Sequence, residues 1–311
     1  MNRKNFIKTL GLSAGIAAIP EAKALHIIED RKAEQKFIRI AHLTDTHIQP
    51  EGIAQEGVSK AIDYVQRMDR KPDFIFTGGD HIMDALGKSK ERTLEQWKVW
   101  DNVMRVNKIP VKSCIGNHDV WGWSLPKVSQ KEGNSYSKKW ASEILQMKNR
   151  YYSFTHGLWK FIILDSTYPL SIPGYMAKLD DEQMEWLKGE LSNKGNSTYT
   201  CITSHIPIMC ISSFFDGGTE KKKGGFQIGR GNIHSDAREI KNLLFKNQHV
   251  KVCLSGHIHL IDSHEYLGVK YFCNGAVSGN WWGGRYQEFD PALAIVDLYD
   301  DGSVENKIVY Y

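Results

Sequence analysis

Residues 250–259 read VKVCLSGHIH, a short apolar run followed directly by two histidines, His257 and His259. Side chains two apart in a strand point to the same side, so both imidazoles would leave this strand end together. Gly256 has no Cβ, which lets the backbone turn sharply and approach a site. Such a pair can bind one metal ion or two neighbouring ions, but two histidines two apart are also common on surfaces. The interpretation depends on whether other strand ends supply matching ligands.

The rest of the chain predicts strands that alternate with helices and then give way to antiparallel hairpins. Apolar residues recur at helical spacing over 56–69, for example, and form short strand-like runs elsewhere. We expect strands at 37–43, 74–76, 110–115, 151–154, 159–164, 199–203, 250–254, 265–267, 270–273, 293–298 and 304–310, and helices at 56–69, 89–107, 137–148, 180–191 and 235–247. This order predicts mixed sheets with flanking helices, a layered α/β domain.

Five polar clusters stand at the ends of these predicted strands, where layered α/β proteins bind their ligands. The clusters are Asp45 with His47, Asp80, Asn117 with His118, His205, and His257 with His259. One polar turn after a strand is ordinary. Five clusters that all use carboxylate, imidazole or amide groups favour a shared site.

The spacing of these clusters resembles that of the calcineurin-like metallophosphoesterases, whose pattern is DxH, GD, GNHD, H and GHxH. The matching residues, in order, are Asp45-Thr46-His47, Gly79-Asp80, Gly116-Asn117-His118-Asp119, His205 and Gly256-His257-Ile258-His259. The resemblance extends from residue 37 to about residue 280. It implies the metallo-dependent phosphatase fold, a four-layer αββα sandwich of two mixed β-sheets flanked by helices, within a single domain over residues 25–311.

The resemblance also implies a ligand set for two metal ions. It assigns Asp45, His47 and His259 to the first ion, Asn117, His205 and His257 to the second, and Asp80 as the bridge between them. Nitrogen and oxygen ligands without thiolate suit divalent or trivalent Mn, Fe or Zn, and the sequence does not choose among them. Two ions about 3.5–4 Å apart would hold a bridging hydroxide that attacks phosphorus in line.

His118 is expected to assist by protonating or hydrogen-bonding the leaving oxygen. The alternative is that it only fixes its loop, as hydrogen-bonding partners around metal sites often do. Asp84 is a candidate to orient His118, although the family often places an acid at the position that Met83 occupies here. Met83 also excludes the purple acid phosphatases, which have a metal-binding tyrosine there. His81 would point away from the site in an alternating strand, so we expect a structural role for it.

Clues to the substrate are fewer. Trp121, Trp281 and Arg285 are candidate substrate-binding residues, because aromatic rings beside a metal site can stack on a base or sugar and an arginine can bind an anion. The alternative is that the tryptophans pack the rim of the site. The resemblance implies hydrolysis of a small phosphomonoester or phosphodiester. A cyclic-nucleotide 3',5'-phosphodiesterase is one alternative, and a catalytically silent metal-binding or scaffold protein is another.

Composition restricts the partners and the compartment. The 311 residues carry a net charge of +4, and most of it lies in the first 24 residues, so no nucleic-acid polymer is expected as a partner. Residues 1–24 combine a basic start, an uncharged stretch and a small-x-small site, which predicts a twin-arginine-like export signal and a periplasmic or extracellular protein. An amphipathic N-terminal helix is the alternative. We expect no stable membrane association after cleavage, and five cysteines without a CxxC spacing argue against a disulfide framework. The oligomeric state stays open.

Overall fold

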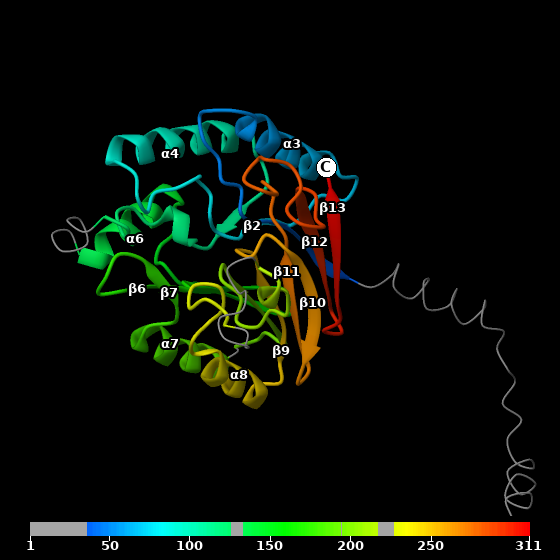
Figure 1. Ribbon diagram of the computed structural model, residues 1–311. Coiled ribbons are helices and arrows are strands. Elements are labelled where there is room, and N and C mark those ends of the chain that lie inside the picture. The colour runs from blue at the N-terminus through cyan, green and yellow to red at the C-terminus, as the bar shows by residue number, and fades with distance from the viewer. Residues whose placement is uncertain (1–35, 126–132, 194, 217–226) are drawn as a thin grey trace, which may run out of the picture. The chain divides into compact units, whose positions relative to one another are not determined.

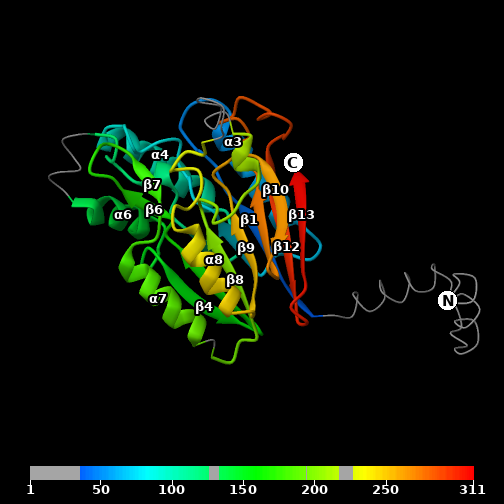
Figure 2. The same ribbon diagram turned by 60° about the horizontal axis from the view of Figure 1, so that its bottom comes forward.

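Two β-sheets form the body of the protein (Figures 1 and 2). The computed structural model describes residues 36–125, 133–193, 195–216 and 227–311. Within them, the first sheet has the strand order β13-β12-β1-β2-β3. Its strands are β1 (Phe37–Leu43), β2 (Phe74–Thr77), β3 (Val111–Ser113), β12 (Ala292–Tyr299) and β13 (Val304–Tyr310). β1, β2 and β3 run parallel, and β12 and β13 pair antiparallel, so this sheet is mixed as predicted.

The second sheet has the order β10-β11-β9-β8-β5-β4. Its strands are β4 (Tyr152–His156), β5 (Trp159–Leu164), β8 (Tyr199–Ser204), β9 (Val250–Ser255), β10 (Ile261–Tyr266) and β11 (Val269–Asn274). The four inner strands run parallel, and the two edge strands pair antiparallel. A separate small hairpin joins β6 (Thr167–Pro169) to β7 (Tyr175–Ala177).

Helices cover the outer faces of both sheets. The helices are α3 (Ala54–Arg67), α4 (Lys90–Met104), α6 (Gly133–Ile144), α7 (Asp181–Ser192) and α8 (Ala237–Lys246), with 3-10 turns η1 (Asn117–Asp119) and η2 (Ser212–Phe214). Figure 1 shows α3 and α4 on one side and α7 and α8 on the other, with the sheets between them. Buried apolar residues from α3 and α4 pack on the first sheet, and those from α7 and α8 pack on the second. The predicted four-layer αββα sandwich is therefore confirmed.

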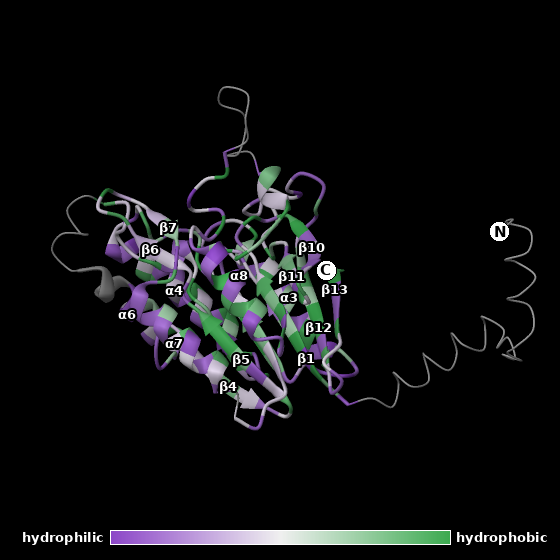
Figure 3. Cartoon of the chain, turned by 90° about the horizontal axis from the view of Figure 1, so that it is seen from below, coloured by the Kyte–Doolittle hydropathy of each residue, from purple (hydrophilic) through white to green (hydrophobic). Residues whose placement is uncertain are grey.

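The alternation of β1 shows how the sequence divides its residues between the layers. Ile38 and Ile40 pack between the two sheets against Trp159 of β5, whereas Ala41 and Leu43 join the cluster beneath α3 and α4. Successive strand residues point to opposite faces, which accounts for this division. Figure 3 shows apolar residues concentrated along the strands, while the helices mix apolar and polar residues. Burial of both sheet faces, at roughly 25 cal/mol per Å² of apolar surface, holds the sandwich together.

The structure differs from the sequence prediction in two strand regions. β10 begins at Ile261 rather than at residue 265, because its first half is a polar edge strand held by backbone pairing with β11. The hairpin β6–β7 was not predicted, since its three-residue strands are too short to show an alternating pattern. Neither difference moves a predicted ligand.

The predicted export signal, residues 1–24, lies outside the described residues and stays a prediction. Among the helices that the structure describes, none has the length and apolarity needed to cross a bilayer. The five cysteines are buried free thiols.

Candidate metal centre

Five strand ends from the two sheets bring the predicted ligands together. Asp45 and His47 follow β1, Asp80 follows β2, Asn117 and His118 lie in η1 after β3, His205 follows β8, and His257 and His259 follow β9. The carboxyl ends of parallel strands meet at one edge of a sheet, so this placement follows from the topology. Neither sheet alone carries the whole set.

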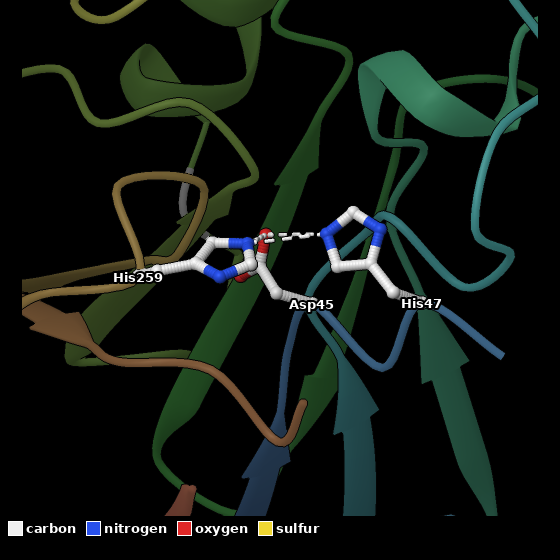
Figure 4. Close-up of side chains that lie close together, drawn as sticks. All are labelled: Asp45, His47 and His259. Carbon is white, nitrogen blue, oxygen red and sulfur yellow. Dashed lines mark hydrogen bonds and ion pairs between the residues drawn. The ribbon is translucent and has the colours of Figure 1, made fainter. Parts of the chain in front are cut away.

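The first group consists of Asp45, His47 and His259, whose side chains converge in Figure 4. The Nε2 atoms of His47 and His259 lie 3.1 Å apart. Asp45 Oδ1 lies 3.5 Å from His259 Nε2 and 4.0 Å from His47 Nε2. Ligands that hold one cation at about 2.0–2.2 Å are separated from one another by about 3–4 Å. The three atoms therefore have the spacing of ligands to a common ion.

The second group consists of Asp80, His205 and His257, with Asn117 beside them. His205 Nε2 lies 3.2 Å from Asp80 Oδ2 and 3.1 Å from Asn117 Oδ1. His257 supplies a further ring nitrogen within the same group. This is a mixed nitrogen and oxygen donor set, as the sequence predicted for a second ion.

Asp80 lies between the two groups. Its Oδ2 atom is 3.2 Å from His205 Nε2 in the second group and 3.8 Å from His47 Nε2 in the first. The other oxygen, Oδ1, accepts a hydrogen bond of 2.7 Å from the backbone N–H of His118. One carboxylate is thus within reach of both groups.

The chemistry of the donors fits a cation in each group. Asp45 Oδ1 and His257 Nδ1 are buried and have no hydrogen-bond partner among the described residues, which is costly unless a ligand satisfies them. Burial lowers the pKa of His257 to about 3 and that of His47 well below its ordinary value. Both imidazoles are therefore neutral, the form that binds metal.

His205 behaves differently. Burial disfavours its charged form, but Asp80 outweighs this effect and raises the pKa of His205 to about 9. Asp80 therefore attracts positive charge to the point between the groups, and a cation there would take the place of the proton.

Backbone carbonyls orient two of the imidazoles. His259 Nδ1 donates to the carbonyl of Gly279 at 2.5 Å, and His205 Nδ1 donates to the carbonyl of Gly78 at 2.7 Å. A carbonyl can only accept, so these bonds place the proton on Nδ1 and leave each Nε2 free as a ligand. The sequence carries no signal for these carbonyls, because any residue type offers one.

Five of the seven candidate ligands have a left-handed backbone conformation. Left-handed φ angles occur at Asp45 (56°), His47 (40°), Asp80 (51°), His257 (70°) and His259 (60°). Such angles are uncommon outside glycine and collect at functional sites. The loops hold one another in place, since Asp45 N–H donates to Gly79 and His47 N–H to Asp80.

Gly256 allows two of these loops to touch. A Cβ at this position would lie 2.1 Å from Thr44 Oγ1 and 2.2 Å from Asp45 Oδ2. The predicted close approach is therefore confirmed. The predicted sharp turn belongs instead to His257, whose backbone N–H donates to Asp45 Oδ2 at 2.9 Å.

His118 lies at the solvent side of the centre. Its side chain is 26% exposed, whereas those of Asp80 and the first group are at most 2% exposed. Its Nε2 atom is 4.0 Å from Asp80 Oδ2, and its Nδ1 atom is 3.6 Å from Asp84 Oδ1. Burial lowers its pKa, but Asp80 and Asp84 prevail and raise it to about 9. Asp84 thus faces His118 despite its shifted position in the sequence.

Asp119 is an organising residue that the sequence reasoning passed over. Its carboxylate accepts the backbone N–H groups of Asp80 at 3.0 Å, His81 at 2.8 Å and Gly116 at 2.8 Å. It also bonds to His81 Nδ1 at 2.9 Å. His81 is therefore structural, as predicted, and Asp119 ties two ligand loops together. Its place as the last residue of the GNHD block was the signal for this role.

The three predicted substrate residues lie in different surroundings. Trp281 stacks on His259, with ring centroids 4.3 Å apart and planes at 28°, and is 40% exposed. Trp121 is 7% exposed, donates to the carbonyl of Lys88, and belongs to the apolar cluster beneath α3 and α4. Arg285 is exposed and pairs with Asp290 through two bonds of 3.0 and 2.9 Å. Of these three, Trp281 lies directly against a candidate ligand.

Tyr175 of β7 also lies at the centre, with its ring 6.4 Å from that of His257. Burial raises its pKa, so the hydroxyl is neutral. Because β7 was not predicted, this residue could not be placed near the second group from the sequence.

Comparison with known proteins agrees with this geometry. The family profile of the calcineurin-like phosphoesterases matches residues 38–260. The chain belongs to this family. A 3',5'-cyclic-nucleotide phosphodiesterase from Nostoc sp. is 24% identical over 285 residues, covering 88% of this chain and 93% of that protein. The 3',5'-cyclic adenosine monophosphate phosphodiesterase CpdA from Pseudomonas aeruginosa is 22% identical over 287 residues, covering 89% and 91%.

A solved structure of a dimetal phosphatase from Danio rerio shares the fold. Its TM-score is 0.58 at 13% identity, over 88% of this calcineurin-like phosphoesterase and 99% of that chain. The protein is therefore a hydrolase that acts on phosphoric ester bonds, and its family depends on metal ions.

Proposed function

We propose that the protein is a dinuclear-metal phosphoesterase whose substrate is a small phosphate ester, with a 3',5'-cyclic nucleotide as the first candidate. The position of Asp80 within reach of both ligand groups is the observation that carries the dinuclear proposal. Like charges a few ångströms apart need an anion between them, and this carboxylate supplies one.

The residues divide into two ligand sets. Asp45, His47, Asp80 and His259 would hold one cation, and Asp80, Asn117, His205 and His257 the other. When bound, two such cations polarise phosphoryl oxygens and lower the pKa of water. Hydrogen bonds between the loops position the donors before a cation arrives, and burial keeps the imidazole of His257 neutral and ready to bind one.

His118 is the candidate acid for the leaving oxygen. Its backbone N–H is fixed on Asp80, and its partly exposed ring points its two nitrogens toward Asp80 and Asp84. Asp84 is a positioning residue, since it faces Nδ1 and leaves Nε2 on the side of the centre. A positioned acid of this kind contributes roughly 10²–10⁴-fold to a rate.

A cyclic nucleotide is favoured over other esters by the two relatives, both of which are named for that activity and match nearly full length. The test uses protein loaded with Mn, metal content measured by elemental analysis, and three substrates: p-nitrophenyl phosphate, its bis ester and 3',5'-cyclic AMP. We expect hydrolysis of the bis ester and of cyclic AMP, with two metal ions per chain.

Two results would contradict the proposal. Full metal loading without hydrolysis of any of these esters, or of nucleotide and sugar phosphates, would favour a silent metal-binding or scaffold protein. Full activity with one ion per chain would rule out the dinuclear mechanism but not the phosphoesterase activity.

A further inference from the structure

Two adjacent tryptophans after β11, Trp281 and Trp282, make different contacts. Trp282 inserts between the first ligand loop and helix α3, and its indole N–H donates to the carbonyls of Thr46 and His47. Trp281 lies against His259 and is 40% exposed. Both have left-handed φ angles, 47° and 70°. They lie in a turn where Gly283 N–H donates to the carbonyl of Asn280 and Asn280 N–H donates to the carbonyl of Gly284.

Gly57 of helix α3 leaves room for the ring of Trp282. A Cβ on Gly57 would lie 1.9 Å from a carbon of the Trp282 six-membered ring, far inside any real contact. Glycine is disfavoured inside helices, so its presence within α3 has a packing reason here. Trp282 is therefore locked from two sides, by the α3 backbone at Gly57 and by two carbonyls of the ligand loop.

Because Trp282 is held in place by these contacts, the position of the adjacent Trp281 is restricted as well. Its ring is 4.3 Å from that of His259 and 5.8 Å from that of His47, both in the first ligand group. Tyr286 meets it edge-on at 5.6 Å and limits its movement on that side. Trp281, which is 40% exposed, is thus held in a fixed position at the rim of the candidate metal centre.

We propose that Trp281 is a stacking surface for a planar aromatic group carried by the substrate, a nucleobase above all, and that Trp282 and Gly57 are its positioning residues. This inference rests on the proposed function, because the phosphate must sit at the ligand groups for the base to reach Trp281. Stacking of a base on an aromatic ring changes affinity by roughly 5- to 150-fold. Trp281 thereby favours nucleoside phosphates over sugar or glycerol phosphates.

Binding of products tests this without relying on turnover. Calorimetric titration of the Mn-loaded protein compares AMP with ribose 5-phosphate, which keeps the sugar and phosphate but lacks the base. Trp281→Ala should weaken AMP roughly 5- to 150-fold and leave ribose 5-phosphate within about twofold, while Trp281→Phe retains most of the AMP affinity. Phe245→Ala, which removes an exposed aromatic from α8, should change neither ligand.

The positioning residues have their own test. Gly57→Ala should weaken the binding of AMP relative to that of ribose 5-phosphate, because the added methyl displaces Trp282 and with it Trp281. Gly189→Ala on α7 is the matched control, since its Cβ meets nothing within 4 Å. If Gly57→Ala fails to fold, the Trp281 pair still decides the stacking proposal.

Three outcomes would overturn the inference: wild-type protein that does not prefer AMP, Trp281→Ala that binds AMP normally, or Trp281→Ala that loses both ligands and metal equally. The last result would mean that Trp281 packs on His259 and does not bind the base. Failure of the proposed function looks different, because a metal-loaded protein without hydrolysis could still show the selective AMP loss in Trp281→Ala.

Discussion

Gly256→Ala should damage the metal centre out of proportion to the single methyl group that it adds. The new Cβ would lie 2.1 Å from Thr44 Oγ1 and 2.2 Å from Asp45 Oδ2, so the loop must move by about 1 Å to restore normal contact. Overpacking of this kind costs about 1–3 kcal/mol. The movement also breaks the 2.9 Å bond from His257 N–H to Asp45, which costs about 1.5–3 kcal/mol for a charged acceptor. Together these effects should lower the free energy of unfolding by about 2.5–6 kcal/mol.

Urea unfolding of the metal-free proteins measures this loss, and elemental analysis after Mn loading shows whether both ligand groups survive. Because His257 and His259 move away from Asp45 together, we expect less than one ion per chain in Gly256→Ala. Gly189→Ala is the control, since it lies inside α7 in open space and should gain up to about 1 kcal/mol. Gly256→Ala with wild-type stability and two bound ions would show that the two loops are not interlocked, and the reasoning would fail.

The remaining predictions concern catalysis, metal content and acid stability. His118→Ala should keep both ions and lose roughly 10²–10⁴-fold in kcat, and loss of metal would instead make the residue structural. Asp80→Asn should empty or halve the metal content, and unchanged occupancy would refute the bridging role. Burial raises the pKa of Asp165, but Lys138 and Arg150, at 2.6 and 2.9 Å, prevail and hold it below the ordinary 3.8. Its stabilising effect is therefore present above about pH 4 and is lost as the pH falls through the lowered pKa, so Asp165→Asn should flatten the acid limb of unfolding free energy against pH, measured from pH 6 to 3.

Lys138 and Asp165 respond differently to the same ion pair. Burial lowers the pKa of Lys138 despite the nearby carboxylate, whereas that of Asp165 stays low. The carboxylate has two cationic partners, Lys138 and Arg150, while Lys138 shares its anion with the arginine. Because Lys138 shares the carboxylate with Arg150, the attraction of Asp165 does not offset the hydration free energy that the amine loses on burial.

The meeting of the candidate ligands was predictable, because few residue types bind metal ions and these residues follow the ends of strands. Asp45, Asp80 and His205 lie one to three residues beyond the ends of β1, β2 and β8, and parallel strands end at a common edge. The positions of these residues after predicted strands therefore indicated that their side chains meet in space. The four-layer arrangement followed from the resemblance, and alternation along strands such as β1 is consistent with it.

Other parts of the centre could not be predicted from the sequence, because no residue type marks them. Gly78 and Gly279 act through backbone carbonyls, which every residue has. Tyr175 reaches His257 from a three-residue strand that shows no periodicity. Asp84 is displaced by one position from the usual spacing, and only the path of the loop after β2 shows that it still faces His118.

The left-handed backbone at the ligands indicates how the two sheets and the centre depend on each other. Asp45, His47 and Asp80 extend from the first sheet, and His257 and His259 from the second, all at positive φ. Each such conformation costs about 1–3 kcal/mol and persists only where neighbouring structure fixes it. The bonds that fix these loops are partly within the first sheet, from Asp45 to Gly79, and partly across the sandwich, from His257 N–H to the Asp45 carboxylate. Because the Asp45 carboxylate accepts a bond from the loop of the opposite sheet, the geometry of the candidate ligands depends on how the two sheets pack. The position of the histidine pair after β9 is therefore set by the whole sandwich rather than by its own strand.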